Sequence, residues 1–298
     1  MSIPAGIDYA APIAELPRSR AEWTLEPHRA ALLVHDLQRY FVRPFSENCA
    51  ALRTAIATTA ELTRLAREAG VPVFYTAQQG DQDQVERGLQ RDLWGPGMSG
   101  IPEHTDIIDE VAPGPNDVVL TKHRYSAFAR SDLAERLAAD GRDQLIITGV
   151  YAHIGIAATA LEAFQREIHP FVVADGVADF GAEQHRLALA QIAGCCGVVT
   201  LASDMTAALT TAGEGTETMT HEADAVIRAG LQEVISSERV DEAFARPDAD
   251  LFEIGFDSLR AFQLMDALAD GGIDIDFGEF VRTPTINWLR SQAGTRAV

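Results

Sequence analysis

Three positions in this chain combine residue types and a placement that could support acid–base chemistry: Asp36, Lys122 and Gly155. Each follows a short apolar run that predicts a buried strand. The carboxyl ends of parallel strands meet at one edge of a sheet, where ligands bind. A positioned carboxyl group could deliver a proton, and backbone N–H groups at a helix start could bind an anion. The sequence therefore predicts one site that the three residues share.

The segment from Gln144 to Ala160 shows this arrangement most clearly. Its β-branched run breaks at Thr148-Gly149, and a small-residue helical pattern begins near Gly155, which predicts a strand, a tight elbow and a helix. A Cys or Ser at residue 155 would indicate acyl transfer, whereas Gly indicates backbone donors and an open space. The nucleophile is then expected to come from elsewhere, most simply from water.

Lys122 is the only lysine of the chain, among 24 Lys and Arg residues in total. A single lysine in an arginine-rich sequence indicates a position that requires a compact ammonium group. The alternative is drift at a surface position, and the count alone leaves both interpretations open.

The elements that would position these residues alternate between strands and helices. We expect strands at 30–35, 72–76, 117–120, from 144 onward, at 171–174 and at 198–201, with helices at 52–69, 133–139, 155–168 and 182–193. A polar loop is expected over 78–100. This alternation predicts an α/β fold with a doubly wound parallel sheet.

The composition changes at 209–221, which is small, polar and without periodicity, and predicts a linker between domains 1–208 and 222–298. The second domain carries 15 Asp and Glu against 7 Arg, a net charge of −8. Helical periodicity appears at 223–236, after Ser258 and after Thr285, with an acidic loop before the second of these. The pattern predicts a small all-α bundle.

The overall composition excludes several classes of function. A formal net charge of −20 argues against a nucleic-acid partner, because phosphate binding needs clustered Lys and Arg. Three cysteines are too few for a disulfide framework, and the first residues lack a basic, then apolar, signal pattern. No apolar run approaches the roughly 18 residues of a membrane span. We expect a cytoplasmic protein without a membrane partner.

The motif GFDSL, residues 255–259, places Ser258 at the start of a predicted helix. On its own it is typical of an ordinary helix N-cap. Together with the upstream amphipathic helix and the late TPTI segment, residues 222–298 resemble an acyl or aryl carrier protein. The resemblance implies that Ser258 carries 4′-phosphopantetheine as a covalent cofactor, at the positive end of a helix dipole.

Five segments of the first domain occur in a fixed order: VHDLQRYFV, YTAQQ, WGPG, TKHRYSAF and ITGVYAHIG. Together they resemble the isochorismatase branch of the cysteine-hydrolase-like fold. With the carrier, the whole chain resembles the bifunctional isochorismate lyases and aryl carrier proteins of catechol siderophore assembly by nonribosomal synthesis. Amide-cleaving relatives have Cys where this chain has Gly155, and the departure agrees with the isochorismatase branch.

Cleavage of an enolpyruvyl ether needs a proton on the terminal carbon, after which water captures the oxocarbenium ion. Asp36 is the expected general acid, and the alternative is a strand-end Asp that caps the next helix. Burial should raise the pKa of Asp36, whereas Lys122 favours its ionised form. Either the substrate carboxylate takes up the Lys122 charge, which we favour, or desolvation outweighs the ion pair.

The resemblance also implies a set of substrate-binding residues. Gln78 and Arg87 would bind the substrate, with Arg91 as a rival for Arg87, and Tyr151 and the Gly155 N–H would orient its polar end. The expected cavity walls are Phe45, Trp94, Tyr125 and Phe128.

Two further features have simpler interpretations. His153 is expected to be a satisfied buried histidine, and Cys195 and Cys196 an apolar packed pair. His35, Asp36 and His153 lack metal-ligand spacing, so we expect no metal.

The resemblance implies isochorismate as substrate and 2,3-dihydro-2,3-dihydroxybenzoate and pyruvate as products. The implied partners are a phosphopantetheinyl transferase, an aryl-adenylating ligase that supplies an acid such as 2,3-dihydroxybenzoate, and a condensation domain. They would contact the helix after Ser258, through exposed residues that include Arg260 and Asp266. A homodimer is expected. The alternatives are a phenazine-type hydrolase of 2-amino-2-deoxyisochorismate and a carrier whose hydrolase-like domain is an inactive scaffold.

Overall fold

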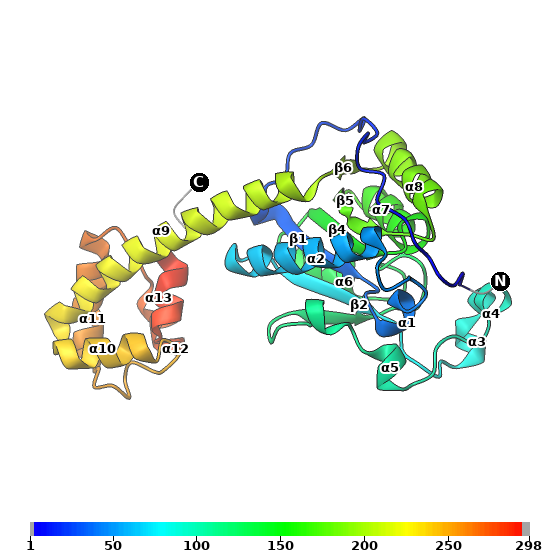
Figure 1. The fold of residues 1–298 in the computed structure, drawn as a ribbon. Coiled ribbons are helices and arrows are strands. Elements are labelled where there is room, and N and C mark those ends of the chain that lie inside the picture. The colour runs from blue at the N-terminus through cyan, green and yellow to red at the C-terminus, as the bar shows by residue number, and fades with distance from the viewer. Residues whose placement is uncertain (1–2, 294–298) are drawn as a thin grey trace. The chain divides into compact units, whose positions relative to one another are not determined.

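The computed structural model describes residues 3–293, and within 213–221 it describes the backbone alone. The chain divides into two compact units, Met1–Gly213 and Glu214–Val298. The first unit holds a β-sheet with helices, and the described part of the second holds helices without strands (Figure 1). Within the described residues, each helix is too short or too polar to cross a bilayer.

The sheet of the first unit has six strands in the order β3-β2-β1-β4-β5-β6, and all neighbouring strands are parallel. The strands are β1 (Ala30–His35), β2 (Val73–Ala77), β3 (Val118–Thr121), β4 (Gln144–Val150), β5 (His169–Ala178) and β6 (Val198–Thr200). The order reverses between β1 and β4, so the crevice at their carboxyl ends is where a ligand is expected. The predicted doubly wound sheet is confirmed.

Strand β4 continues to Val150, past the break that we predicted at Thr148-Gly149. Gly149 has a φ of +112°, and a Cβ there would lie 2.1 Å from the His35 carbonyl oxygen. Gly149 therefore permits β1 and β4 to approach closely within the strand, rather than ending it.

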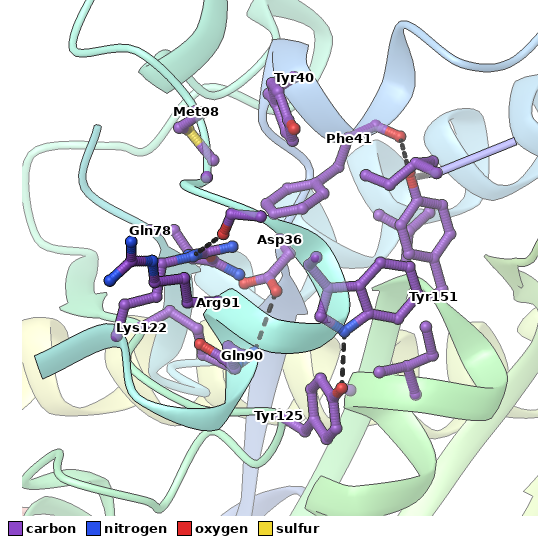
Figure 2. A pocket seen from close by; sticks show the side chains of 18 of the residues that line it. Asp36, Tyr40, Phe41, Gln78, Gln90, Arg91, Met98, Lys122, Tyr125 and Tyr151 are labelled. Atoms are coloured by element: carbon purple, nitrogen blue, oxygen red, sulfur yellow. Dashed lines mark hydrogen bonds and ion pairs between the residues drawn. The ribbon is translucent and has the colours of Figure 1, made fainter. Parts of the chain in front are cut away.

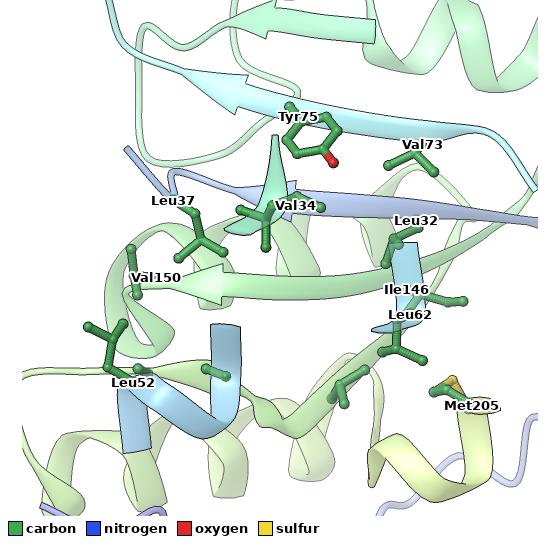
Figure 3. Packing of buried hydrophobic residues seen from close by; sticks show 14 of the residues in the cluster. Leu32, Val34, Leu37, Leu52, Leu62, Val73, Tyr75, Ile146, Val150 and Met205 are labelled. Atoms are coloured by element: carbon green, nitrogen blue, oxygen red, sulfur yellow. The ribbon is translucent and has the colours of Figure 1, made fainter. Parts of the chain in front are cut away.

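Apolar side chains of each strand alternate between two cores, one on each face of the sheet. On one face, Leu32 and Val34 pack with α2 (Ala50–Glu68) and with Met205 at the start of α9 (Ala202–Val234) (Figure 3). On the other, Leu33 packs with α6 (Leu133–Ala139), α7 (Ala157–Gln165) and α8 (Ala182–Cys195). Helices therefore cover both faces, and the open edge at the strand ends remains for a site.

The predicted polar loop over 78–100 contains two short helices, α3 (Gln84–Arg87) and α4 (Leu89–Trp94), so the loop prediction is wrong there. The Asp83 carboxylate accepts from the backbone N–H groups of Val85 and Glu86, which starts α3. Gly88 and Gly95, with φ of +57° and +71°, flank α4. The remaining short elements are η1 (Pro27–Arg29), α1 (Arg39–Val42), α5 (Pro102–Thr105), η2 (Asp109–Val111) and η3 (Ala152–Ile156).

The second unit contains the end of α9, α10 (Ser237–Ala245), α11 (Ser258–Asp270), α12 (Phe277–Arg282) and α13 (Ile286–Ala293) around one apolar core. Two predictions are wrong here. Helix α9 passes through 209–221, where irregular backbone was expected, and α10 lies within the expected acidic loop. The division between the units still falls inside 209–221. Its Thr, Glu and Ala residues are tolerated in a helix although they give no apolar stripe.

Candidate active site

Asp36, Lys122 and Gly155 line one cavity of about 530 Å³ at the carboxyl edge of the sheet. Figure 2 shows Asp36 and Lys122 among the side chains of this cavity. Asp36 follows β1, Lys122 follows β3, and Gly155 lies in the π-helical turn η3 after β4. The Lys122 backbone N–H donates to the Ala77 carbonyl, which continues the β2–β3 ladder past the end of the strand. The topology thus brings together the three residues that the sequence predicted to meet.

Asp36 and Lys122 form a buried ion pair, with 3.0 Å between Lys122 Nζ and Asp36 Oδ2. The second carboxylate oxygen accepts from Thr76 Oγ1 at 2.6 Å, and Thr76 Oγ1 in turn accepts from the Asp36 N–H. Asp36 is 6% exposed and Lys122 3% exposed. Lys122 is therefore not a drifting surface residue, and it balances a carboxylate removed from water.

Burial raises the pKa of the Asp36 carboxyl, but the Lys122 ammonium and the Thr76 hydrogen bond outweigh burial and hold that pKa below its usual range. Burial lowers the pKa of Lys122, which the Asp36 charge opposes. In the free protein Asp36 is therefore the charged partner of Lys122. The lowered pKa favours the route in which the substrate carboxylate takes up the Lys122 charge.

The space beside Gly155 is filled by His35, so the prediction of open space is wrong. A Cβ on Gly155 would lie 2.2 Å from Cε1 of His35. The fully buried His35 ring donates from Nδ1 to the Val150 carbonyl at 2.8 Å, and burial lowers its pKa to about 4. The imidazole is neutral at pH 7, and it occupies the place of a nucleophile's side chain.

Both candidate arginines line the cavity. Arg87 is buried, and it donates from Nε to the Gly95 carbonyl at 2.7 Å and from Nη1 to Gln82 Oε1 at 2.9 Å. These bonds fix the guanidinium group while Nη2 remains for a ligand. Arg91, on α4, is exposed and also lines the cavity. Two positive groups can thus meet an anionic ligand.

Gln78 is positioned by Gln38, a residue that sequence reasoning missed. The Gln38 side chain accepts from the Gln78 N–H at 2.7 Å and donates to the Gln78 carbonyl at 2.8 Å. These two hydrogen bonds hold the Gln78 backbone, so the Gln78 side chain can contact a ligand in the cavity that it lines. The buried Gln38 follows Asp36 by two residues, a proximity that could have marked it.

Two of the predicted wall residues, Trp94 and Tyr125, line the cavity, as does Tyr151, which was predicted to orient the substrate. Trp94 Nε1 donates to Tyr125 Oη at 2.7 Å, which joins the end of α4 to the segment after β3. Tyr151 Oη donates to the Phe41 carbonyl at 2.6 Å. The rings are therefore fixed before any ligand enters.

Phe45 and Phe128 do not line the cavity. Phe45 is buried behind Tyr151, with ring centroids 6.0 Å apart, and Phe128 packs in the core under the Arg166 guanidinium. The lining residues that the sequence reasoning missed are Ile3, Tyr40, Phe41, Gln90, Asp92, Gly95, Gly97, Met98, Val150, Ile154 and Phe180.

His153 is partly exposed, so the prediction of a buried histidine is wrong, although it is satisfied: its Nδ1 bonds to the buried Asp179 at 2.5 Å. Cys196 is buried as expected, but Cys195 is exposed. Among the side chains that the structure describes, those of residues 3–212 and 222–293, no three from His, Cys, Asp or Glu are grouped so that they could hold a metal ion.

Ser258 is exposed in the first turn of α11, in the second unit. Asp257 caps the helix by accepting from the Arg260 N–H at 2.9 Å, and Gly255 has a φ of +105° that favours glycine. Arg260 is half-buried because its Nη1 donates to the Gly255 carbonyl, which corrects its expected exposure. Asp266 is exposed as expected.

Comparison with known proteins matches both units. Residues 30–204 match the isochorismatase domain, and residues 227–289 match the phosphopantetheine attachment site. Enterobactin synthase component B of Escherichia coli K12 is 40% identical over 96% of both chains. The isochorismatase of Bacillus subtilis is 37% identical over 100% of this chain and 97% of its own. Phenazine biosynthesis protein PhzD1 of Pseudomonas aeruginosa is 48% identical, over 66% of this chain and 95% of its own.

Solved structures agree with the first unit. An isochorismatase family protein from Burkholderia thailandensis is 30% identical, with a TM-score of 0.57, over 66% of this chain and 100% of its own. A cysteine hydrolase from Pseudomonas syringae pv. phaseolicola is 25% identical, with a TM-score of 0.58, over 67% of this chain and 99% of its own.

Proposed function

Because the chain belongs to the isochorismatase family and carries a phosphopantetheine attachment domain, we propose that it hydrolyses isochorismate and holds an aryl acid on its carrier unit. The products are 2,3-dihydro-2,3-dihydroxybenzoate and pyruvate. The observation that carries the proposal is the buried Asp36–Lys122 pair at a cavity lined by aromatic and cationic side chains, in a chain that also presents Ser258 at a helix start.

The reaction needs one proton and one water. Asp36 donates a proton to the terminal methylene carbon of the enolpyruvyl group, which becomes a methyl group and leaves an oxocarbenium ion. Water adds to the ether-bearing carbon of this ion and returns a proton to Asp36, which yields a neutral hemiketal. Collapse of the hemiketal breaks the bond to the ring oxygen and releases pyruvate and the ring diol.

Asp36 must be protonated for the first step, although Lys122 holds its pKa low in the free protein. Isochorismate carries two carboxylates. A substrate carboxylate that binds near Lys122 shares the ammonium charge and adds negative charge beside Asp36, and both effects raise the pKa of Asp36. Binding of the substrate thus supplies the acid form that the reaction requires.

The remaining cavity residues bind and orient the substrate. Arg87 and Arg91 offer guanidinium groups to the two carboxylates, and Gln78 offers an amide to a ring hydroxyl. The Gly155 N–H and Tyr151 orient the polar end. No residue needs to form a covalent bond with the substrate, which agrees with the imidazole of His35 in the place of a nucleophile.

The carrier unit works with enzymes that modify and load it. A phosphopantetheinyl transferase attaches the arm to Ser258, and an aryl-adenylating ligase loads the arm with an acid such as 2,3-dihydroxybenzoate. A condensation domain of a nonribosomal synthetase then takes the aryl group. These partners contact the exposed side of α11, where Leu259, Phe262 and Asp266 lie. Attachment of the arm uses coenzyme A and loading uses ATP, which supports a cytoplasmic location, and we expect a homodimer.

The test of the hydrolase is pyruvate release from isochorismate by the full chain. Asp36→Asn should lower kcat by about 10²- to 10⁴-fold, the usual contribution of a general acid. Asp109→Asn, which changes an exposed carboxylate bound to Arg39, is the matched control and should leave turnover unchanged. Activity in Asp36→Asn close to that of the unmodified chain would refute the acid role.

A second candidate substrate is 2-amino-2-deoxyisochorismate. It is favoured by the 48% identity of the hydrolase part to a phenazine biosynthesis protein and by the Asp92 carboxylate in the cavity wall, which suits an ammonium group. The ratio of kcat/KM for the two substrates decides between them. Turnover of neither substrate would leave the hydrolase unit as a scaffold.

A further inference from the structure

Two arginines approach the loop that precedes Ser258. Arg239 comes from the first turn of α10, and a Cβ built on Gly255 would lie 2.3 Å from its Nη1 and 2.9 Å from its Cζ. Arg260 comes from α11, and its Nη1 donates to the Gly255 carbonyl at 2.5 Å. Two guanidinium groups from different helices therefore meet at Gly255, three residues before the modified serine.

The charge of these two groups is not neutralised by nearby carboxylates. Residues 222–298 carry a net charge of −8, and three of their arginines, Arg228, Arg246 and Arg290, form ion pairs with Asp or Glu. Among the residues that the structure describes, no carboxylate lies within ion-pair distance of Arg239 or Arg260. An acidic unit thus keeps two unpaired cations at one loop.

The group that becomes attached at this loop is an anion. 4′-Phosphopantetheine is joined to serine through a phosphodiester, so one negative charge appears next to the Ser258 Oγ atom. The neighbouring Asp257 carboxylate caps α11 and repels that charge. A guanidinium group offers paired N–H donors that match phosphate oxygens. The two unpaired arginines can therefore attract the phosphodiester, which Asp257 repels.

We propose, resting on the carrier function proposed above, that Arg239 binds the phosphodiester of the pantetheine arm, with Arg260, held against Gly255, as the second positive charge. The contact favours a position of the arm base beside α10 and leaves the thiol end free to travel. An exposed ion pair of this kind changes the ratio of bound to free arm base by up to about fivefold. The arm base therefore exchanges between bound and free positions, and salt favours the free position.

The test is phosphorus NMR of the full chain after attachment of phosphopantetheine, with the attachment established by intact mass. In the unmodified sequence, the phosphodiester resonance should narrow and move as sodium chloride is raised. Arg239→Gln should give a narrow resonance already at low sodium chloride, and this resonance should not move as salt is raised. Arg239→Lys should restore part of the salt dependence.

Arg246→Gln is the matched control, because it removes one positive charge at the other end of α10 while its partner Glu242 is exposed. Its spectrum should follow that of the unmodified sequence. Superimposable spectra of Arg239→Gln and the unmodified sequence would overturn the assignment. A chain that gains no phosphopantetheine mass would overturn the carrier role itself, and the two failures are told apart by the mass measurement.

Discussion

The imidazole of His35 occupies the volume into which a side chain at Gly155 would project, with 2.2 Å between a Cβ at residue 155 and Cε1 of His35. Both residues are buried at the switch point of the sheet, one at the end of β1 and the other after β4. The site is therefore closed to a cysteine nucleophile by packing and not only by the choice of residue.

Gly155→Ala should destabilise the first unit. The added methyl group must displace a ring that is held by Val150, and overpacking of this kind costs about 1–3 kcal/mol in the free energy of unfolding. Differential scanning calorimetry of the full chain measures the change through the transition of the hydrolase unit.

Gly194→Ala on α8 is the matched control, because a Cβ there meets nothing within 4 Å. It should be neutral or stabilise the helix by up to about 1 kcal/mol. Equal effects of the two substitutions would show that His35 yields freely, and the packing argument would then fail.

The positions at strand ends could be predicted from the sequence, whereas the residues that hold them could not. Asp36, Lys122 and Gly155 follow apolar strands, and the parallel topology forces their convergence. The packing of His35 against Gly155 depends on the close approach of β1 and β4 at Gly149, which no local pattern encodes. Contacts of this kind arise only once the sheet has formed.

Helices without an apolar stripe also escaped prediction from the sequence. The 209–221 part of α9 has small polar residues, and α4 turns Leu89 and Leu93 outward while Trp94 faces the cavity. Hydrophobic periodicity identifies helices that bury one face in a core. It misses those that border a ligand cavity or join two units.

Thr76→Val should shift the pH dependence of hydrolysis toward higher pH. Asp36 acts in its protonated form, and its pKa is held low in the free protein, so kcat/KM falls as pH rises through that pKa. The Thr76 hydroxyl donates to the carboxylate and stabilises its charged form. Its removal raises the pKa of Asp36, and the falling limb moves to higher pH.

The measurement is kcat/KM for isochorismate across the pH range. Thr63→Val is the control, because Thr63 is buried on α2 and its hydroxyl donates to the Thr59 carbonyl, away from the cavity. That variant should keep the original pH profile. A limb that stays in place, or moves to lower pH, in Thr76→Val contradicts the proposed role of the hydroxyl.

Tyr125→Phe should weaken substrate binding more than catalysis. The Tyr125 hydroxyl accepts from Trp94 Nε1, and this bond fixes the α4 side of the cavity wall. Loss of one buried hydrogen bond costs about 0.5–1.5 kcal/mol, so KM should rise by up to about tenfold while kcat changes little.

Trp94→Phe removes the same bond from the other side, and the double variant tests the pair. The effects should be less than additive. Full additivity would mean that the two rings contact the substrate independently and that the bond between them is incidental.

Ser258→Ala should abolish attachment of phosphopantetheine and leave hydrolysis untouched. Ser258 is exposed in the first turn of α11, and its loss removes only the hydroxyl that the transferase modifies, since Asp257 supplies the helix cap. The measurement is intact mass after incubation with coenzyme A and a broad-specificity phosphopantetheinyl transferase, alongside isochorismate turnover by the same sample.

Ser236→Ala is the control and should gain the full mass, because this serine at the start of α10 makes no side-chain cap bond. A mass gain that persists in Ser258→Ala would assign the arm to another hydroxyl. A gain absent from the unmodified chain, with the transferase active on a known carrier, would reduce GFDSL to a helix cap and favour the phenazine-type reaction for the hydrolase unit.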